Sequence, residues 1–391
     1  MRLLQGMVVI ICMMAYGNAS CQEDAHPVFI SGQEGYNTYR IPAIIALPGG
    51  ELLAFCEGRV NGAADFGNVD IVMKRSTDQG KTWGALQHVV DNDVLQAGNP
   101  APVVDLTDKR FPKGRIFLFY NTGDKNETEI RKGNGYKQVW YITSTDGGHT
   151  WSKAEDITLQ VHKPNRPEVN PAYRFPEDWR TYATVPGHAI QFTEGKYKGR
   201  IYVAANHTAG NIQPGFANGR AHGYYSDDHG ITFHLSEDVN VPGGNESTAA
   251  ALSGNRLVMN SRNQKGNVKA RIVSYSSDGG QTWDTSYYDH QLPDPVNEAS
   301  ILAIGKRKGK TILAFSNAAD TAHRDNLTLR ISFDEGISWP KSFLVDKAAV
   351  RDGRKDHTAY SDLVNINKRQ VGILYERDNY SAIVFRSITW Q

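Results

Sequence analysis

One eight-residue pattern occurs five times along this chain of 391 residues, and this repetition limits the folds that the chain can adopt. Each copy reads Ser-x-Asp-x-Gly-x-Thr/Ser and ends in Trp or Phe. The copies are Ser76–Trp83, Ser144–Trp151, Ser226–Phe233, Ser276–Trp283 and Ser332–Trp339. A pattern that returns every few tens of residues is typical of proteins built from stacked structural repeats.

A second family of segments repeats around these copies. Six segments read as a turn, an apolar run and then polar residues: 50–59, 114–123, 199–208, 255–264, 310–319 and 369–378. Another apolar segment precedes each of them, and an alternating segment that leads into the eight-residue pattern follows most of them. Because no long amphipathic helix intervenes, we predict an all-β fold, a six-bladed β-propeller of four-stranded antiparallel blades. The last unit lacks room for a fourth strand, so we expect the N-terminal segment 26–30 to complete that blade and close the ring.

The eight-residue pattern then falls between the third and fourth strands of a blade. Its Asp and Gly residues suit a hairpin turn, with the carboxylate accepting local backbone N–H groups and the aromatic ring packing between blades. A row of calcium sites is the alternative, but a calcium loop needs a denser alternation of oxygen ligands. These turns belong to one face of the propeller, so we expect the function on the other face.

The N-terminus indicates export. Arg2 is followed by a short apolar run and small residues, which predicts a signal peptide over 1–20. The remaining residues, 22–391, are expected to form the propeller as a single domain. Cleavage before Cys21 would make the protein a lipoprotein with a lipid anchor on that residue. We expect an extracytoplasmic protein, periplasmic, secreted or anchored to the outer membrane of a bacterium. Cys56 lies in an apolar run and reads as a buried thiol.

The charge balance argues against nucleic acid as a partner. Lys plus Arg total 43 and Asp plus Glu total 42, so no overall positive field exists. His222, His229 and His234 are close in sequence, but their spacing fits no common zinc pattern. We therefore predict no metal and no other cofactor, and we expect a monomer.

Chemically capable residues gather at the ends of strands that share the second face. These are Arg40, Arg59, Asp65, Glu246, Arg262, Arg324, Tyr360 and Glu376. Several guanidinium groups directed at one point repel one another unless an anion lies among them. The planar guanidinium group can donate two parallel hydrogen bonds to the two oxygens of a carboxylate. The predicted ligand therefore carries a carboxylate.

The combination of motifs resembles the bacterial exo-sialidases, a family of six-bladed propellers with repeated Asp boxes. The resemblance rests on "YRIP" at 39–42, the five boxes, "ES" at 246–247, "SRN" at 261–263 and "AYSDL" at 359–363. It spans essentially the whole mature chain. The third box departs slightly from the pattern, with His229 before its glycine and Phe233 in place of Trp.

The resemblance implies how the substrate is bound. Arg40, Arg262 and Arg324 would bind the carboxylate of sialic acid, Arg59 would lie near the sugar, and Glu376 would hold Arg40 in place. Arg330 is the alternative to Arg324 as the third of these arginines, but we expect Arg330 to lie inside a strand and not at the end of one. The substrates would be sialylated glycans, glycoproteins or glycolipids.

The resemblance also implies the chemistry. Tyr360 would be the nucleophile, Glu246 its base and Asp65 the acid/base, giving hydrolysis with retention through a tyrosyl-enzyme intermediate. A neutral phenol avoids the repulsion that an anionic nucleophile would meet at an anomeric carbon bearing a carboxylate. An intramolecular trans-sialidase, an enzyme that transfers sialic acid to another sugar, and a sialoglycan-binding propeller without turnover remain as alternatives.

One proline-rich stretch, 161–188, interrupts the repeat spacing. It ends on the proposed functional face. We therefore expect a loop that walls the sugar site, with Trp179 or Tyr182 contacting the aglycone.

Overall fold

The computed structural model describes residues 25–349 and 356–391. The predicted signal peptide 1–20 and the possible lipidation site at Cys21 lie outside the described residues. In the described part, β-strands dominate and the helices are short, so the all-β prediction is confirmed. None of these helices is long and apolar enough to cross a membrane.

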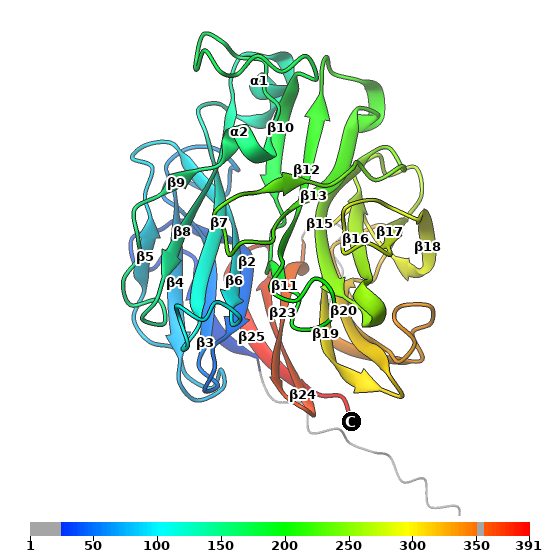
Figure 1. The fold of residues 1–391 in the computed structure, drawn as a ribbon. Helices are drawn as coiled ribbons and strands as arrows, with labels where there is room; N and C mark the ends of the chain where they lie inside the picture. Colours follow the sequence, from blue (N-terminus) through cyan, green and yellow to red (C-terminus); the bar gives the residue numbers. More distant parts are fainter. Residues whose placement is uncertain (1–24, 350–355) are drawn as a thin grey trace, which may run out of the picture.

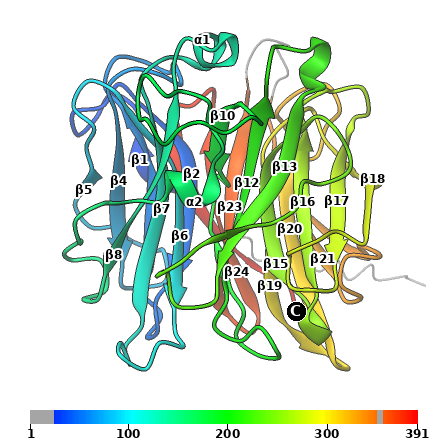
Figure 2. The ribbon, with the colours of Figure 1, turned by 45° about the horizontal axis from the view of Figure 1, so that its top comes forward.

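The strands form five hydrogen-bonded sheets arranged around a common centre (Figure 1, Figure 2). The eight-stranded sheet contains β2 (Thr38–Ala46), β3 (Leu52–Arg59), β4 (Val69–Ser76), β5 (Gln87–Val90), β6 (Gln96–Asp105), β7 (Arg115–Gly123), β8 (Lys137–Ser144) and β9 (Glu155–Asp156). The five-stranded sheet contains β10 (Trp179–Thr184), β11 (Ile190–Gln191), β12 (Ile201–Ala209), β13 (Gly219–Ser226) and β14 (His234–Leu235).

The other three sheets have four strands each. One contains β15 (Gly244–Ala251), β16 (Leu257–Asn263), β17 (Ala270–Ser276) and β18 (Thr285–Pro293). The next contains β19 (Ala299–Arg307), β20 (Lys310–Ala318), β21 (Leu327–Ser332) and β22 (Lys341–Asp346). The last contains β23 (Thr358–Asn367), β24 (Gln370–Arg377), β25 (Ala382–Thr389) and β1 (His26–Ile30). The helical pieces are α1 (Glu127–Lys132), α2 (Thr158–Val161), η1 (Pro214–Phe216) and η2 (Ser253–Asn255).

The prediction of six separate four-stranded blades is wrong. The first two repeats are joined into one sheet, because β4 and β6 run parallel where Val69 pairs with Gln96. In the third repeat, β10 and β11 both pair with β12, which gives five strands instead of four. Irregular backbone between 185 and 189 separates these two strands.

The ring is not closed by the N-terminal strand. β1 pairs with β25 at the outer edge of the last sheet, as the expected completion of that sheet requires. The first and last sheets instead meet through β2 and β23. There the backbone N–H of Ile44 donates to Asp362 Oδ2 at 2.8 Å, so a buried side chain links the two sheets.

The second strand of each repeat is buried on both faces. Every residue of β3 and of β16 is buried, for example, and the same holds for nearly all of β12 and β24. Apolar side chains of each such strand pack between neighbouring sheets, as Leu53 and Phe55 do against Ile116 and Leu118. A strand covered on both faces reads as a continuous apolar run, which is the pattern that the sequence shows.

The five copies of the eight-residue pattern are turns. In the second copy, Asp146 Oδ1 accepts the backbone N–H groups of His149 and Thr150, both at 3.0 Å, and Oδ2 accepts the Thr150 hydroxyl at 2.6 Å. The Trp151 ring then packs on Phe55 of the neighbouring repeat, with ring centroids 6.1 Å apart. The turns follow the ends of strands such as β8, opposite the strand ends that carry the candidate site residues.

Candidate active site

The strands that carry the candidate residues begin with irregular pairing. The register shifts between Arg40 and Ala43 in β2, between Gly244 and Ser247 in β15, and between Thr358 and Ser361 in β23. Such bulges re-aim side chains next to functional sites. They place Arg40, Glu246 and Tyr360 at the same end of three of the sheets.

A cavity of about 710 Å³ opens where these strand ends converge. Six of the eight candidate residues line it: Arg40, Asp65, Glu246, Arg262, Arg324 and Tyr360. Glu376 is fully buried beside it, and Arg59 lies at an adjoining smaller cavity. The structure therefore brings together residues that the chain separates by more than 300 positions.

Tyr360, Glu246 and Arg262 form a closed hydrogen-bonded triangle. The Tyr360 hydroxyl donates to Glu246 Oε1 at 2.6 Å, and Arg262 Nη1 donates to the Tyr360 oxygen at 2.9 Å and to Glu246 Oε2 at 2.7 Å. Burial raises the pKa of Tyr360 well above its ordinary value, and the Glu246 charge acts in the same direction. The phenol is therefore neutral at pH 7, with a carboxylate already in contact with its proton.

Glu376 organises the floor of the cavity. Its Oε1 accepts Arg40 Nε at 2.6 Å and the backbone N–H of Ile41 at 2.9 Å, and its Oε2 accepts the backbone N–H of Tyr360 at 3.2 Å. Ile41 has a φ of +61°, which is a rare conformation for a β-branched residue. The carboxylate thus holds both Arg40 and the backbone of Tyr360, and the local strain lies directly between site residues.

Arg59 lies between two carboxylates. It donates to Glu57 Oε2 from Nε at 2.9 Å and from Nη2 at 2.6 Å, and to Asp65 Oδ1 from Nη1 at 2.8 Å. The Asp65 side chain is 81% exposed on the rim. Partial desolvation opposes ionisation of Asp65, but Arg59 and Arg40 outweigh it and hold the pKa of this carboxyl below its ordinary value.

Arg324 reaches the cavity, whereas Arg330 does not line it. Arg324 Nη1 donates to the Tyr380 hydroxyl at 3.1 Å, and its guanidinium lies 5.7 Å from the centroid of the Tyr360 ring. Arg330 lies in β21 and donates to Asn317 Oδ1 at 3.0 Å. Arg324, and not Arg330, therefore lines the cavity together with Arg40 and Arg262.

Several residues in or beside the cavities of the site were not singled out from the sequence. The ring of Tyr380 stacks on Arg40, with the guanidinium carbon 3.9 Å from the ring centroid. Tyr380 lies in a turn whose polar sequence gave no sign of a functional role. Glu127 and Arg131 reach the cavity from α1, which lies at the top of the molecule in Figure 1. Glu57 could have been found, because a carboxylate inside the apolar run of β3 needs a buried partner.

The structure separates the two aromatic residues of the stretch 161–188 that were expected as alternatives at the site. Trp179 is buried in β10 and stacks on His207, with ring centroids 3.5 Å apart, so it does not wall the site. Tyr182 is also buried, but it lines the smaller cavity beside Tyr360.

Two groups of side chains in the described part could hold a metal ion by geometry. The first is His207, His222 and Asp238, in which the two histidine Nδ1 atoms lie 3.2 Å apart. The second is Asp105, Asp108 and His229. In this group Arg110 Nη2 forms an ion pair with Asp108 Oδ2 at 2.7 Å, and His229 Nδ1 lies 2.7 Å from Asp105 Oδ2. Neither group lines the cavity around Tyr360.

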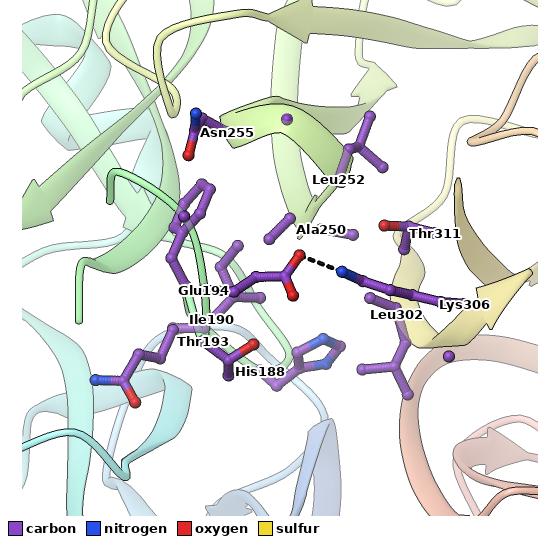
Figure 3. Close-up of a pocket in the computed structure, with 18 residues that line it drawn as sticks. His188, Ile190, Thr193, Glu194, Ala250, Leu252, Asn255, Leu302, Lys306 and Thr311 are labelled. Carbon is purple, nitrogen blue, oxygen red and sulfur yellow. Dashed lines mark hydrogen bonds and ion pairs between the residues drawn. The ribbon is translucent and has the colours of Figure 1, made fainter. Parts of the chain in front are cut away.

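A separate cavity of about 520 Å³ lies at the opposite ends of the strands (Figure 3). Its lining is mostly apolar, with Ile190, Leu252 and Leu302 labelled in the view, and Glu194 pairs with Lys306 across it. None of the candidate site residues lines it. The cavity around Tyr360 and this apolar cavity are therefore separate sites.

The chain matches proteins of one family over most of its length. The model of the BNR repeat-like domain matches residues 50–373. A sialidase of Micromonospora viridifaciens is 33% identical over 368 residues, which cover 89% of this chain but 51% of that protein. A sialidase of Paraclostridium sordellii is 27% identical over 372 residues, covering 92% of this chain and 87% of the relative.

Solved structures show the same arrangement. A Hadza microbial sialidase superposes with a TM-score of 0.77 at 26% identity, covering 94% of this chain and 68% of that chain. The intramolecular trans-sialidase from Ruminococcus gnavus superposes with a TM-score of 0.71 at 17% identity, covering 93% and 97%, which shows a shared fold alone. With the BNR repeat-like model matching most of its length, the chain belongs to the sialidase family.

Proposed function

We propose that this protein is an exo-α-sialidase that hydrolyses terminal sialic acids from glycoconjugates with retention, through a covalent intermediate on Tyr360. The observation that carries the proposal is the 2.6 Å hydrogen bond from the Tyr360 hydroxyl to Glu246, inside a cavity that Arg40, Arg262 and Arg324 also line. The curated relatives named sialidase support the reaction class.

The arginines suit a carboxylate ligand. Glu376 accepts a hydrogen bond from Arg40 Nε, and this bond does not use the two terminal nitrogens of Arg40. Arg262 Nε is buried and has no hydrogen-bond partner in the described part of the chain. A carboxylate among Arg40, Arg262 and Arg324 would neutralise their mutual repulsion and accept several charge-assisted hydrogen bonds. It would also place the adjacent anomeric carbon near the Tyr360 oxygen.

The first chemical step follows from these contacts. As the Tyr360 oxygen attacks the anomeric carbon, its proton passes to Glu246, while Asp65 protonates the departing glycosidic oxygen. A pre-formed pair of nucleophile and base within hydrogen-bond distance is the usual signature of covalent catalysis. The Glu246–Arg262 ion pair keeps this carboxylate oriented toward the phenol.

The second step reverses the roles. Asp65 removes a proton from water, the water attacks the anomeric carbon, and Tyr360 leaves while recovering its proton from Glu246. Two inversions give net retention. The lowered pKa of Asp65 suits its role as a base. A bound substrate carboxylate would offset the charges of Arg40 and Arg324 and so raise that pKa for the acid role.

Trapping the intermediate tests the proposal directly. A 3-fluorosialyl fluoride should label the protein on the peptide that contains Tyr360, and proton NMR of a fresh reaction should show α-sialic acid first. A label on Asp65 or Glu246, or β-sialic acid as first product, would refute the proposed nucleophile or the stereochemistry. Detection of an anhydro sugar or a sialylated acceptor instead of free sialic acid would favour the transfer alternatives.

A further inference from the structure

Two buried histidines face each other in the third repeat, away from the catalytic cavity. His207 lies in β12 and His222 in the neighbouring strand β13 (Figure 1), and their Nδ1 atoms are 3.2 Å apart. The Trp179 ring stacks on His207, with ring centroids 3.5 Å apart. Neither histidine lines the cavities beside Tyr360, so the chemistry proposed above makes no use of this pair.

Hydrogen bonding within the protein does not satisfy the pair. Two neutral imidazoles carry two N–H groups and two lone pairs, and the contact between the Nδ1 atoms uses one of each. His222 Nε2 is buried and has no hydrogen-bond partner in the described part of the chain. In either tautomer, therefore, one buried ring nitrogen remains unpaired, which costs free energy.

Both histidines are neutral at pH 7. Burial lowers the pKa of His222 to about 3 and the pKa of His207 well below its ordinary value, and the charge of Lys163 adds to both effects. Neutral imidazole is the form that binds a metal ion. Lys163 forms an ion pair with Glu177 at 2.8 Å, which reduces its repulsion of a cation.

Asp238 brings a carboxylate to the same place. One of its oxygens and one ring nitrogen of each histidine lie within 4.8 Å of one another. Asp238 Oδ2 lies 3.7 Å from His207 Nε2, which is too long for a hydrogen bond. Asp238 lies in the loop that follows β14, and its side chain is 41% exposed. Its carboxylate can therefore move onto an ion, and solvent reaches the ion from this side.

The spacing of the histidines fits a tetrahedral zinc ion. Zinc binds imidazole nitrogen at about 2.0–2.1 Å, so two such ligands at the tetrahedral angle lie about 3.3–3.4 Å apart. The Nδ1 atoms of His207 and His222 are 3.2 Å apart, which is close to this value. Two imidazoles with one carboxylate suit zinc, whereas magnesium and calcium prefer oxygen ligands alone.

We propose that His207, His222 and Asp238 form a zinc site with three protein ligands and one water molecule. The ion ties the loop after β14 to strands β12 and β13. The ligands come from two strands and a loop, with 15 positions between the two histidines, so no short zinc motif marks them in the sequence. Since none of the three lines the cavities beside Tyr360, the ion stabilises the fold and takes no part in the reaction.

The test measures metal binding by the full chain, purified without a histidine tag and stripped with a chelator. Calorimetric titration with zinc at pH 7 should show one ion bound per chain, and zinc should raise the melting temperature. Co²⁺ should give the visible absorption spectrum of a tetrahedral complex. His222→Gln and Asp238→Asn should each weaken zinc binding by more than about tenfold. The kcat of the wild-type protein should be the same with and without zinc.

His229→Gln is the matched control, because it makes the same chemical change in the group formed with Asp105 and Asp108 and should keep the wild-type affinity for zinc. No zinc binding by the wild-type protein, or wild-type affinity in both His222→Gln and Asp238→Asn, would overturn the inference. An equal loss in His229→Gln would do the same, because it would place the ion elsewhere. If His222→Gln does not fold, Asp238→Asn decides, since it keeps the shape of a partly exposed side chain.

Discussion

The contact between Tyr360 and Glu246 makes a double-mutant cycle the sharpest test of the mechanism. Tyr360→Phe removes the hydroxyl that donates to Glu246 at 2.6 Å and accepts from Arg262 at 2.9 Å. The Glu246–Arg262 ion pair at 2.7 Å remains, so no buried charge loses its charged partner and the variant should fold. Glu246→Gln keeps the shape of the side chain but removes the base.

The expected magnitudes follow from the two roles. Loss of a general base costs about 10²–10⁴ in kcat. Loss of the nucleophile costs at least about 10³, because residual rate then comes from binding alone. If the two residues act as one unit, the double variant is no slower than Tyr360→Phe. The coupling free energy is then about 2.7–5.4 kcal/mol, at 1.36 kcal/mol for each tenfold change.

The assay is kcat and kcat/KM on sialyllactose, with binding of a non-hydrolysable sialic acid analogue measured by calorimetry. Binding to Tyr360→Phe should change by less than about tenfold, since one neutral hydrogen bond is the most that the ligand could lose. Tyr375→Phe is the matched control, because Tyr375 is another buried phenol that donates to a carboxylate, Asp346, at 2.7 Å outside the site. Rate losses that multiply in the double variant, or near-normal turnover by Tyr360→Phe, would refute the reasoning.

Three further outcomes are expected. Asp65→Ala should lower kcat/KM by about 10²–10⁴ on sialyllactose and far less on an activated aryl sialoside, whose leaving group needs little protonation; equal losses on both would contradict the acid role. Asp146→Ala should destabilise the protein by about 0.5–2 kcal/mol in thermal unfolding, by analogy with capping residues, while the folded protein keeps its kcat/KM. Local hydrogen bonds hold the pKa of Asp146 below its ordinary value, so this loss of stability should be complete above about pH 4 and become smaller as pH falls toward the pKa of the folded state. Abolished turnover with an unchanged melting temperature would contradict the placement of this turn on the face opposite the site. Dialysis against a chelator should leave kcat unchanged, and a loss restored by one divalent cation would show that a metal takes part.

Local features were accessible from the sequence because their interactions are local. Each box turn is closed by bonds between residues at most four positions apart, such as Asp146 with Thr150, so the eight-residue pattern contains the whole turn. The apolar second strands were equally legible, since burial on both faces leaves a continuous run. The alternation of strand direction then placed the candidate residues on one face, and six of them line one cavity.

Which strands join into one sheet was not accessible in this way. The pairing of Val69 with Gln96 depends on how closely two repeats approach each other, and the sequence of neither strand predicts that distance. The same applies to Trp179, which is aromatic and lies in an irregular stretch, as an exposed ring would, yet is buried against His207. Only the neighbours in space decide whether such a ring is covered.

By itself the sequence therefore determined the strands, the turns and the set of residues that could act together. The tertiary structure decided the contacts that give those residues their roles. Arg40 meets Glu376 across 336 positions, and Tyr360 meets Glu246 across 114. Such contacts depend on the register and packing of several sheets at once, which is why the two adjoining cavities beside Tyr360 appear only in the folded chain.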